Sequence, residues 1–271
     1  MKEILFPVIA LGGIGALFAL LLAFAGKFFA VERDERLPLI EEALPGANCG
    51  GCGFAGCSAC ANAIIEGNAP VNACPVGGNE CAKKIASIMG VEANDEAKKV
   101  AHVMCSGGNA NAKKKYEYSG IKDGIAASKV QGGPLECSYG CLGMGTCKAV
   151  CPYDAIEIVD GVAKVMSDKC KACGKCVAAC PRGIINIVSF DQDVFVSCSN
   201  HNKGAELRSM CNIGCIGCSL CVKNCEFNAI HVDNFLAHID YDKCTYCGKC
   251  ATVCPRKLIT NQSEIVSVKA E

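Results

Sequence analysis

Cysteine is the residue type through which this chain could do chemistry, with 25 cysteines among 271 residues. Many of them recur at the short, regular spacings with which proteins hold iron–sulfur clusters. Two groups match the pattern C-x2-C-x2-C-x3-C-P, in which three closely spaced thiolates bind one [4Fe–4S] cluster and the fourth binds the neighbouring cluster. The two groups are Cys170, Cys173, Cys176 and Cys180, and Cys244, Cys247, Cys250 and Cys254.

The C-terminal half of the chain is an internal repeat. Adding 74 to the residue number maps Cys137 onto Cys211 and Cys180 onto Cys254, and eight cysteines align in this way without a gap. Each repeat is therefore predicted to be a bacterial-type 2[4Fe–4S] ferredoxin module whose ligands cross between its two clusters. In the second module this rule predicts two ligand sets: Cys215, Cys218, Cys221 and Cys254, and Cys225, Cys244, Cys247 and Cys250.

The first module departs from this pattern at Met144, which stands where the second module has Cys218. We expect Cys137 to replace the missing thiolate, because the glycines of this loop allow the chain to bring a displaced ligand in. The alternative is that this site holds a [3Fe–4S] cluster or no cluster. The ligand sets predicted for the first module are Cys137, Cys141, Cys147 and Cys180, and Cys151, Cys170, Cys173 and Cys176.

A further cysteine motif precedes the repeat. Its spacing, C-x2-C-x4-C-x16-C, predicts a fifth [4Fe–4S] cluster on a glycine-rich loop whose backbone can approach the cluster closely. A four-thiolate zinc site is the alternative. The predicted ligands are Cys49, Cys52, Cys57 and Cys74. Five cysteines remain, and we interpret them as small buried side chains, with Cys198 and Cys211 as candidates for another metal; they are Cys60, Cys81, Cys105, Cys198 and Cys211.

Composition and motifs exclude several other classes of protein. Lys and Arg number 27 and Asp and Glu number 27, so the chain has no bulk positive charge with which to bind nucleic acid. A disulfide-rich secreted protein would not carry proline-terminated quartets in an ungapped repeat, and zinc ribbons pair two C-x2-C knuckles instead. No dinucleotide fingerprint, phosphate-binding loop or catalytic carboxylate pair is visible. We therefore predict electron transfer without a stand-alone catalytic site.

The N-terminal segment is predicted to be a membrane anchor. The run from Ile4 to Gly26 contains no charged residue, and as a helix it would be roughly 34 Å long, enough to cross a bilayer core of about 30 Å. A cleaved signal peptide is the alternative, but the run is longer than such a segment needs. Lys27, Arg33 and Arg36 follow the run and only Lys2 precedes it, which predicts that the cluster domains lie on the cytoplasmic side.

These features predict an α+β fold class with an N-terminal single transmembrane helix, a four-cysteine iron–sulfur domain and two tandem ferredoxin modules. The expected boundaries are 1–26 for the anchor, 27–45 for a stalk, 46–110 for the four-cysteine domain, 111–130 for a linker, 131–204 for module one and 205–271 for module two.

The order of these parts carries a family resemblance. The anchor, the motif LPGANCGGCGFAGC, the segment Cys74-Pro75-Val76-Gly77-Gly78 and the loop CSYGCLGMGTC together resemble the B subunits of the Rnf family, the ion-translocating ferredoxin:NAD oxidoreductases. The resemblance implies a subunit in the cell membrane that accepts electrons from soluble ferredoxin. It also implies that these electrons pass through about five [4Fe–4S] clusters toward the other subunits, A, C, D, E and G, of a translocase. The alternative is a polyferredoxin subunit of a membrane hydrogenase or formate dehydrogenase.

Overall fold

The computed structural model describes residues 2–28, 34–93 and 97–261; the side chains of residues 2–11, 28 and 261 lie outside this description. Within the described part, short helices and two-stranded sheets form three separate cores. All 25 cysteines are described, and none forms a disulfide. The fold is therefore mixed α and β, as predicted, and cysteine side chains contribute to each of its cores.

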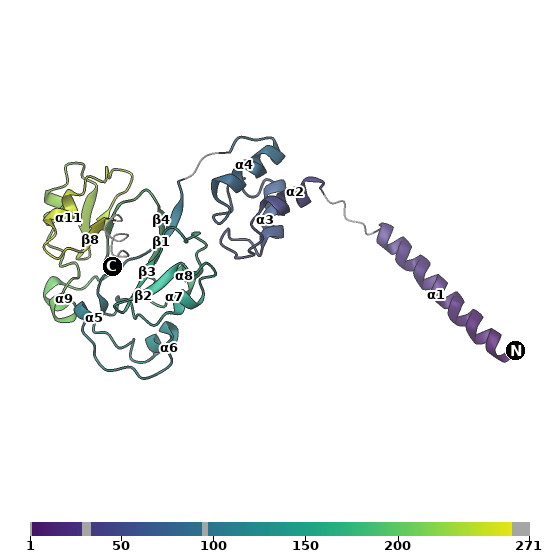
Figure 1. Cartoon of the computed structure of the whole chain (residues 1–271), viewed down its shortest axis with the longest axis horizontal. Helices are drawn as coiled ribbons and strands as arrows, with labels where there is room; N and C mark the ends of the chain where they lie inside the picture. The colour runs from purple at the N-terminus through teal and green to yellow at the C-terminus, as the bar shows by residue number, and fades with distance from the viewer. Residues whose placement is uncertain (1, 29–33, 94–96, 262–271) are drawn as a thin grey trace.

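The first helix, α1 (Lys2–Phe28), is continuous over the predicted apolar run (Figure 1). All of its described residues except Ala25 are exposed, including Phe18 at 60%, Leu22 at 71% and Phe24 at 72%. In the part of the chain that the structure describes, no helix is found to be long and apolar enough to cross a membrane. The predicted span starts at Ile4, whose side chain lies outside the described residues.

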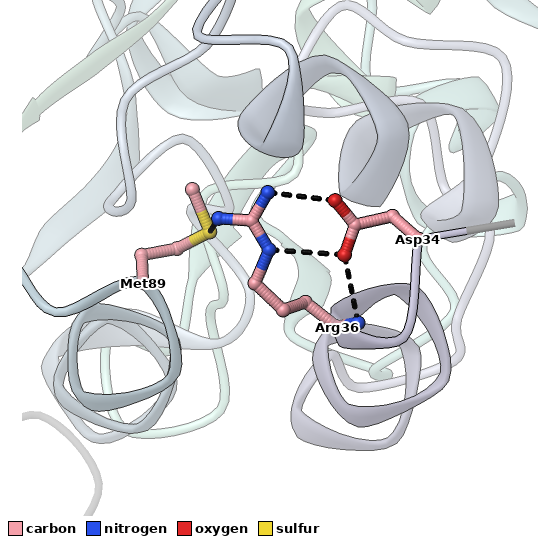
Figure 2. Close-up of polar contacts among 3 residues, drawn as sticks. All are labelled: Asp34, Arg36 and Met89. Atoms are coloured by element: carbon pink, nitrogen blue, oxygen red, sulfur yellow. Dashed lines mark hydrogen bonds and ion pairs between the residues drawn. The ribbon is translucent and has the colours of Figure 1, made fainter.

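The four-cysteine domain, residues 34–93 in the structure, is built from three helices. Ile40, Ile64 and Ile85, one from each helix, are completely buried and form its centre. Arg36 joins the first of these helices to the last: its guanidinium binds the Asp34 carboxylate at 2.6 and 2.9 Å, and it lies 3.7 Å from the Met89 sulfur (Figure 2). The helices are α2 (Arg36–Ala43), α3 (Cys57–Ile65) and α4 (Gly78–Met89).

Each ferredoxin module contains a β-hairpin and a second antiparallel strand pair. The hairpins turn through two residues with positive φ, Asp160 and Gly161 in module one and Asn234 and Phe235 in module two, as the right-handed twist of tight hairpins favours. The elements of module one are β1 (Lys99–Val103), α5 (Gly108–Asn111), α6 (Gly124–Lys129), α7 (Thr146–Ala149), β2 (Ile156–Val159), β3 (Val162–Val165), α8 (Lys175–Ala179) and β4 (Ile185–Ser189). Those of module two are β5 (Val194–Val196), α9 (Gly204–Met210), α10 (Leu220–Lys223), β6 (Ile230–Asp233), β7 (Leu236–Ile239), α11 (Lys249–Val253) and β8 (Ile259–Asn261).

The outer strand pair of each module uses a strand from before the predicted module boundary. Strand β1 falls in the sequence range expected for the four-cysteine domain, yet it pairs with β4 of module one. Strand β5 falls in the range expected for module one, yet it pairs with β8 of module two. Each module thus takes its first strand from the segment that precedes its cysteine motifs, and Figure 1 shows this for β1, which lies beside β4.

The two modules contact each other through these added strands. His102 of β1 stacks on Phe195 of β5, with ring centroids 4.1 Å apart and an interplanar angle of 16°. Phe195 is fully buried. Because both strands are followed within two residues by a cysteine, Cys105 and Cys198, this contact brings cysteines of the two modules to the same region.

Candidate iron–sulfur cluster sites

Local backbone geometry places the third cysteine of each ferredoxin motif at the start of a short helix. The residue before each helix has a positive φ, for example 82° at Gly145 and 73° at Gly248, a conformation that glycine adopts without strain. The chain therefore turns sharply after the cysteine loop, and the helix begins with its N–H groups facing that loop. The cysteines placed in this way are Cys147 in α7, Cys176 in α8, Cys221 in α10 and Cys250 in α11.

Two pockets each bring together a complete predicted set of four cysteines. The space free of protein atoms, part of it open to solvent, is about 320 Å³ in one and about 350 Å³ in the other. Apolar residues such as Ile156 and Ile259 form much of the remaining lining. The cysteines are Cys151, Cys170, Cys173 and Cys176 in the pocket of module one, and Cys215, Cys218, Cys221 and Cys254 in the pocket of module two.

The second pocket of module one contains three cysteines of its predicted set. It has about 400 Å³ of space free of protein atoms, part of it open to solvent, and is lined by Cys141, Cys147 and Cys180 together with Met144. Cys137, the expected fourth ligand, does not line it. Cys137 instead lines a neighbouring cavity, which Cys141 also lines.

The other predicted set of module two contains Cys225, and a backbone N–H donates to this sulfur as one does to Cys151 in module one. The backbone N–H of Ala229 donates to Cys225 Sγ at 3.3 Å, and the N–H of Ala155 donates to Cys151 Sγ at 3.4 Å at the position 74 residues earlier. Burial raises the pKa of Cys250, and the nearby Cys244 and Cys247 thiols add to this shift. The structure therefore brings Cys250 near both of its closely spaced partners.

In the four-cysteine domain, two cysteines outside the predicted ligand set lie against members of it. Cys81 donates a hydrogen bond to Cys74, which lowers the pKa of Cys74 to about 6. Burial, followed by the proximity of Cys52, raises the pKa of Cys60 to about 12. Cys57 begins α3, and its backbone N–H donates to Asn48 Oδ1 at 2.8 Å. That hydrogen bond fixes the ligand loop against the start of the helix.

The pockets suit a polynuclear cluster with sulfur ligands. Burial raises the pKa of Cys147 and of Cys221 to about 11 each, so these thiols keep their protons in the absence of a metal and release them on binding. Backbone N–H groups already point at the sulfurs, as that of Ala101 does at Cys170 Sγ, 3.3 Å away; such bonds tune the potential of bound clusters. Among the described residues, no group of three or more His, Cys, Asp or Glu side chains is arranged to hold a single metal ion.

A further cysteine-lined cavity was missed in the sequence. Cys105, interpreted above as a packing residue, lines it with Cys198 and Cys211, the two named above as candidates for another metal, and with Cys137 and Cys141. The available signal was the repeated segment V-x-C-S at residues 103–106 and 196–199. The offset of 74 residues that aligns the other cysteines does not align these two segments, which hid the repeat.

Comparisons with known proteins match each of the regions that carry the predicted ligand sets. Models described as "4Fe-4S dicluster domain" match residues 134–181 and 214–258. A model described as "Putative Fe-S cluster" matches residues 44–76. The three matched ranges contain all twenty cysteines of the predicted ligand sets, which supports multiple [4Fe–4S] clusters as the cofactors.

Relatives extend over nearly the whole chain. The B subunit of the "Na(+)-translocating ferredoxin:NAD(+) oxidoreductase complex" of Acetobacterium woodii is 50% identical over 97% of this chain and 80% of the relative. The chain belongs to the B-subunit family of ion-translocating ferredoxin:NAD(+) oxidoreductases. The B subunit of the "Ion-translocating oxidoreductase complex" of Methanosarcina acetivorans is 43% identical over 96% of this chain and 99% of the relative. The B subunit of the "Proton-translocating ferredoxin:NAD(+) oxidoreductase complex" of Clostridium ljungdahlii is 40% identical over 94% and 91%.

Membership of the B-subunit family confirms the predicted family, the electron-transfer function and the iron–sulfur cofactors. It also makes the chain part of a multi-subunit, membrane-associated complex. The hydrogenase or formate dehydrogenase host, which the sequence alone left open, gives way to the ferredoxin:NAD(+) oxidoreductase.

Proposed function

We propose that this B subunit accepts electrons from reduced soluble ferredoxin and conducts them to the membrane subunits of its complex. The observation that carries the proposal is the series of cysteine-lined pockets that runs through both ferredoxin modules. A bound [4Fe–4S] cluster supplies a one-electron carrier whose potential the surrounding protein sets. The other subunits of the complex, A, C, D, E and G, are the proposed partners downstream of this chain.

In the ferredoxin modules, each proposed ligand set combines cysteines of one loop with one cysteine from the module's other motif. We propose one cluster for each of five regions, with Cys141, Cys147 and Cys180 as the thiolates of the pocket that also contains Met144. The other four sets are Cys49, Cys52, Cys57 and Cys74; Cys151, Cys170, Cys173 and Cys176; Cys215, Cys218, Cys221 and Cys254; and Cys225, Cys244, Cys247 and Cys250.

The four-cysteine domain and module one are in direct contact at their ligand loops. A side chain at Gly51 would lie 2.8 Å from the Cys173 carbonyl oxygen, so only glycine allows this approach. The negative charge of a Cys49 thiolate contributes to raising the pKa of Cys173, after burial. This contact supports electron exchange between the domain and the module, because electrons tunnel efficiently only between closely spaced centres.

We propose that α1 anchors the chain in the membrane, with the cluster domains on the cytoplasmic side. Large apolar side chains such as Leu20, 70% exposed, and Phe24 cover the described part of this helix, and an apolar surface of this kind calls for a lipid or protein environment. The eight peptide steps from Phe28 to Arg36 span at most about 29 Å. The four-cysteine domain is thereby held close to the membrane.

Module two is the proposed entry point for electrons. Of the cysteines, all of which are described, Cys218 and Cys247 are exposed and the others are buried or half-buried. Both exposed cysteines belong to module two. A soluble ferredoxin can approach a centre near the surface closely, so this module is the one that we expect to contact the donor.

The test is anaerobic reduction of the detergent-solubilised full chain. Reduced ferredoxin should bleach the cluster absorbance, and NADH alone should not. Cys247→Ser should slow reduction by ferredoxin, whereas dithionite, a small reductant, should still reduce the remaining clusters. A matched control is Thr245→Ser, in the same loop and without a ligand role. Rapid reduction of the isolated chain by NADH would refute the proposed function, and so would a chain purified with zinc in place of iron.

A further inference from the structure

A cavity between the two modules is lined by four cysteines that the ferredoxin motifs leave largely unused. They are Cys105, Cys137, Cys198 and Cys211. The space free of protein atoms in this cavity, part of it open to solvent, is about 420 Å³, similar to the 320 to 400 Å³ of the three pockets that the motifs build. Its described lining consists of apolar and neutral polar residues and includes no charged side chain.

The four cysteines are two structurally equivalent pairs. In module one Val103 of β1 faces Ile185, and in module two Val196 of β5 faces Ile259, which lies 74 residues after Ile185. Cys105 and Cys198 each follow the facing valine by two residues and are therefore equivalent. Cys137 and Cys211 are equivalent by the offset of 74. Each module thus contributes the same two thiols to one cavity.

Hydrogen-bond donors point at these sulfurs in the same repeated way. The backbone N–H of Cys141 donates to Cys105 Sγ at 3.4 Å, and that of Cys215, 74 residues later, donates to Cys198 Sγ at 3.4 Å. The amide of Asn200, which is 1% exposed, donates to Cys137 Sγ at 3.2 Å. Donors of this kind stabilise thiolates and reduce the cost of burying their charge.

Contacts around the cavity hold the two modules in a fixed relation. The Lys113 backbone N–H donates to the Met210 carbonyl at 2.9 Å, and the Asn212 N–H donates to the Asn111 carbonyl at 3.0 Å. On the other side, the Ser199 hydroxyl donates to the Met104 carbonyl at 2.9 Å. The thiols of both modules are therefore held around one space.

We propose that Cys105, Cys137, Cys198 and Cys211 ligate an additional [4Fe–4S] cluster at the junction of the modules. The inference rests on the proposed electron-transfer function and deepens it. Cys141 lines both the junction cavity and the pocket of Cys147 and Cys180. Cys215, whose backbone N–H donates to Cys198 Sγ, lines the pocket of Cys218 and Cys221 in module two. The site completes a path between the modules, and it assigns Cys137 away from the pocket that contains Met144.

The experiment measures iron and zinc in the anaerobically purified full chain and in three variants. These are Cys105→Ser in module one, Cys198→Ser in module two, and the double variant, with Ser106→Ala as a control in the same loop. Each single variant should lose about four iron atoms per chain, and the double variant should lose the same four, because the two residues share one cluster. EPR of the dithionite-reduced variants should retain the signals of the other clusters.

The alternative explanations predict different iron contents for the variants. If the substitutions merely unfolded their modules, the double variant would lose the sum of two larger, separate losses, and the inference would be wrong. Unchanged iron in both single variants, or loss of one zinc ion in place of iron, would also overturn it. In those cases about twenty iron atoms per wild-type chain would leave the proposed function standing, whereas a wild-type chain without iron would refute that function itself.

Discussion

Substituting Met144 with cysteine tests how the incomplete pocket of module one is filled. The pocket holds three cysteines, Cys141, Cys147 and Cys180, and Met144 lines it at the position equivalent to Cys218. A cuboidal cluster with three protein thiolates and no fourth ligand readily lacks one iron and is then [3Fe–4S]. Met144→Cys supplies the fourth thiolate, so we expect a gain of about one iron atom per chain.

The assay combines iron analysis with EPR of the air-free, oxidised protein. An oxidised [3Fe–4S] cluster is paramagnetic and an oxidised [4Fe–4S] cluster is EPR-silent, so Met144→Cys should remove the oxidised-state signal of the wild type. Leu142→Cys is the matched control: it adds a thiol to the lining of the same pocket, but at a position that no ferredoxin motif uses. It should leave both the iron content and the signal unchanged.

The result that refutes this reasoning is specific. If Met144→Cys changes neither iron nor EPR signal, and Cys137→Ser removes the cluster of this pocket, then Cys137 is the fourth ligand there. That outcome would restore the assignment based on the sequence and would contradict the proposed assignment of Cys137 to the neighbouring cavity.

Two further predictions concern the junction of the modules. Burial against Phe195 lowers the pKa of His102 to about 4. As the pH falls below about 6.5, this histidine therefore takes up a proton in the unfolded chain and not in the folded chain, so lowering the pH from about 7 to about 5 should cost about 2 kcal/mol of stability. His102→Gln should show a smaller fall in the anaerobic melting temperature over this range. Arg256 donates to the Cys211 carbonyl at 2.8 Å and to the Gly214 carbonyl at 3.3 Å. Arg256→Lys loses this two-point contact, so the variant should be less stable by about 1.5 kcal/mol and should release iron to a chelator faster. Equal release rates in the variant and the wild type would contradict the role of this contact.

The sequence predicted best what depends on short spacings. The ligand sets that contain Cys170 and Cys215 were recognisable because three of their thiolates share one loop and the fourth comes from the module's other motif. In the structure the four cysteines of each set line one pocket. The assignment of β1 and β5 could not be made, because each pairs with a strand far along the chain and the pairing depends on tertiary contacts. The same reason hid the junction cavity, whose cysteines come from four separate loops.

Met144 gains a physical explanation once Cys137 is placed at the junction. The two modules descend from one repeat, so equivalent residues should do equivalent work, and Cys137 and Cys211 do line the same cavity. If Cys137 belonged to the pocket of Cys147, that equivalence would be broken, and the junction cavity that Cys211 lines would lack one of its four ligands. With Cys137 at the junction, the modules differ in one ligand only, Met144 in place of Cys218. This single difference would give one centre in the middle of the path a different iron content, and hence a different potential, from its neighbours.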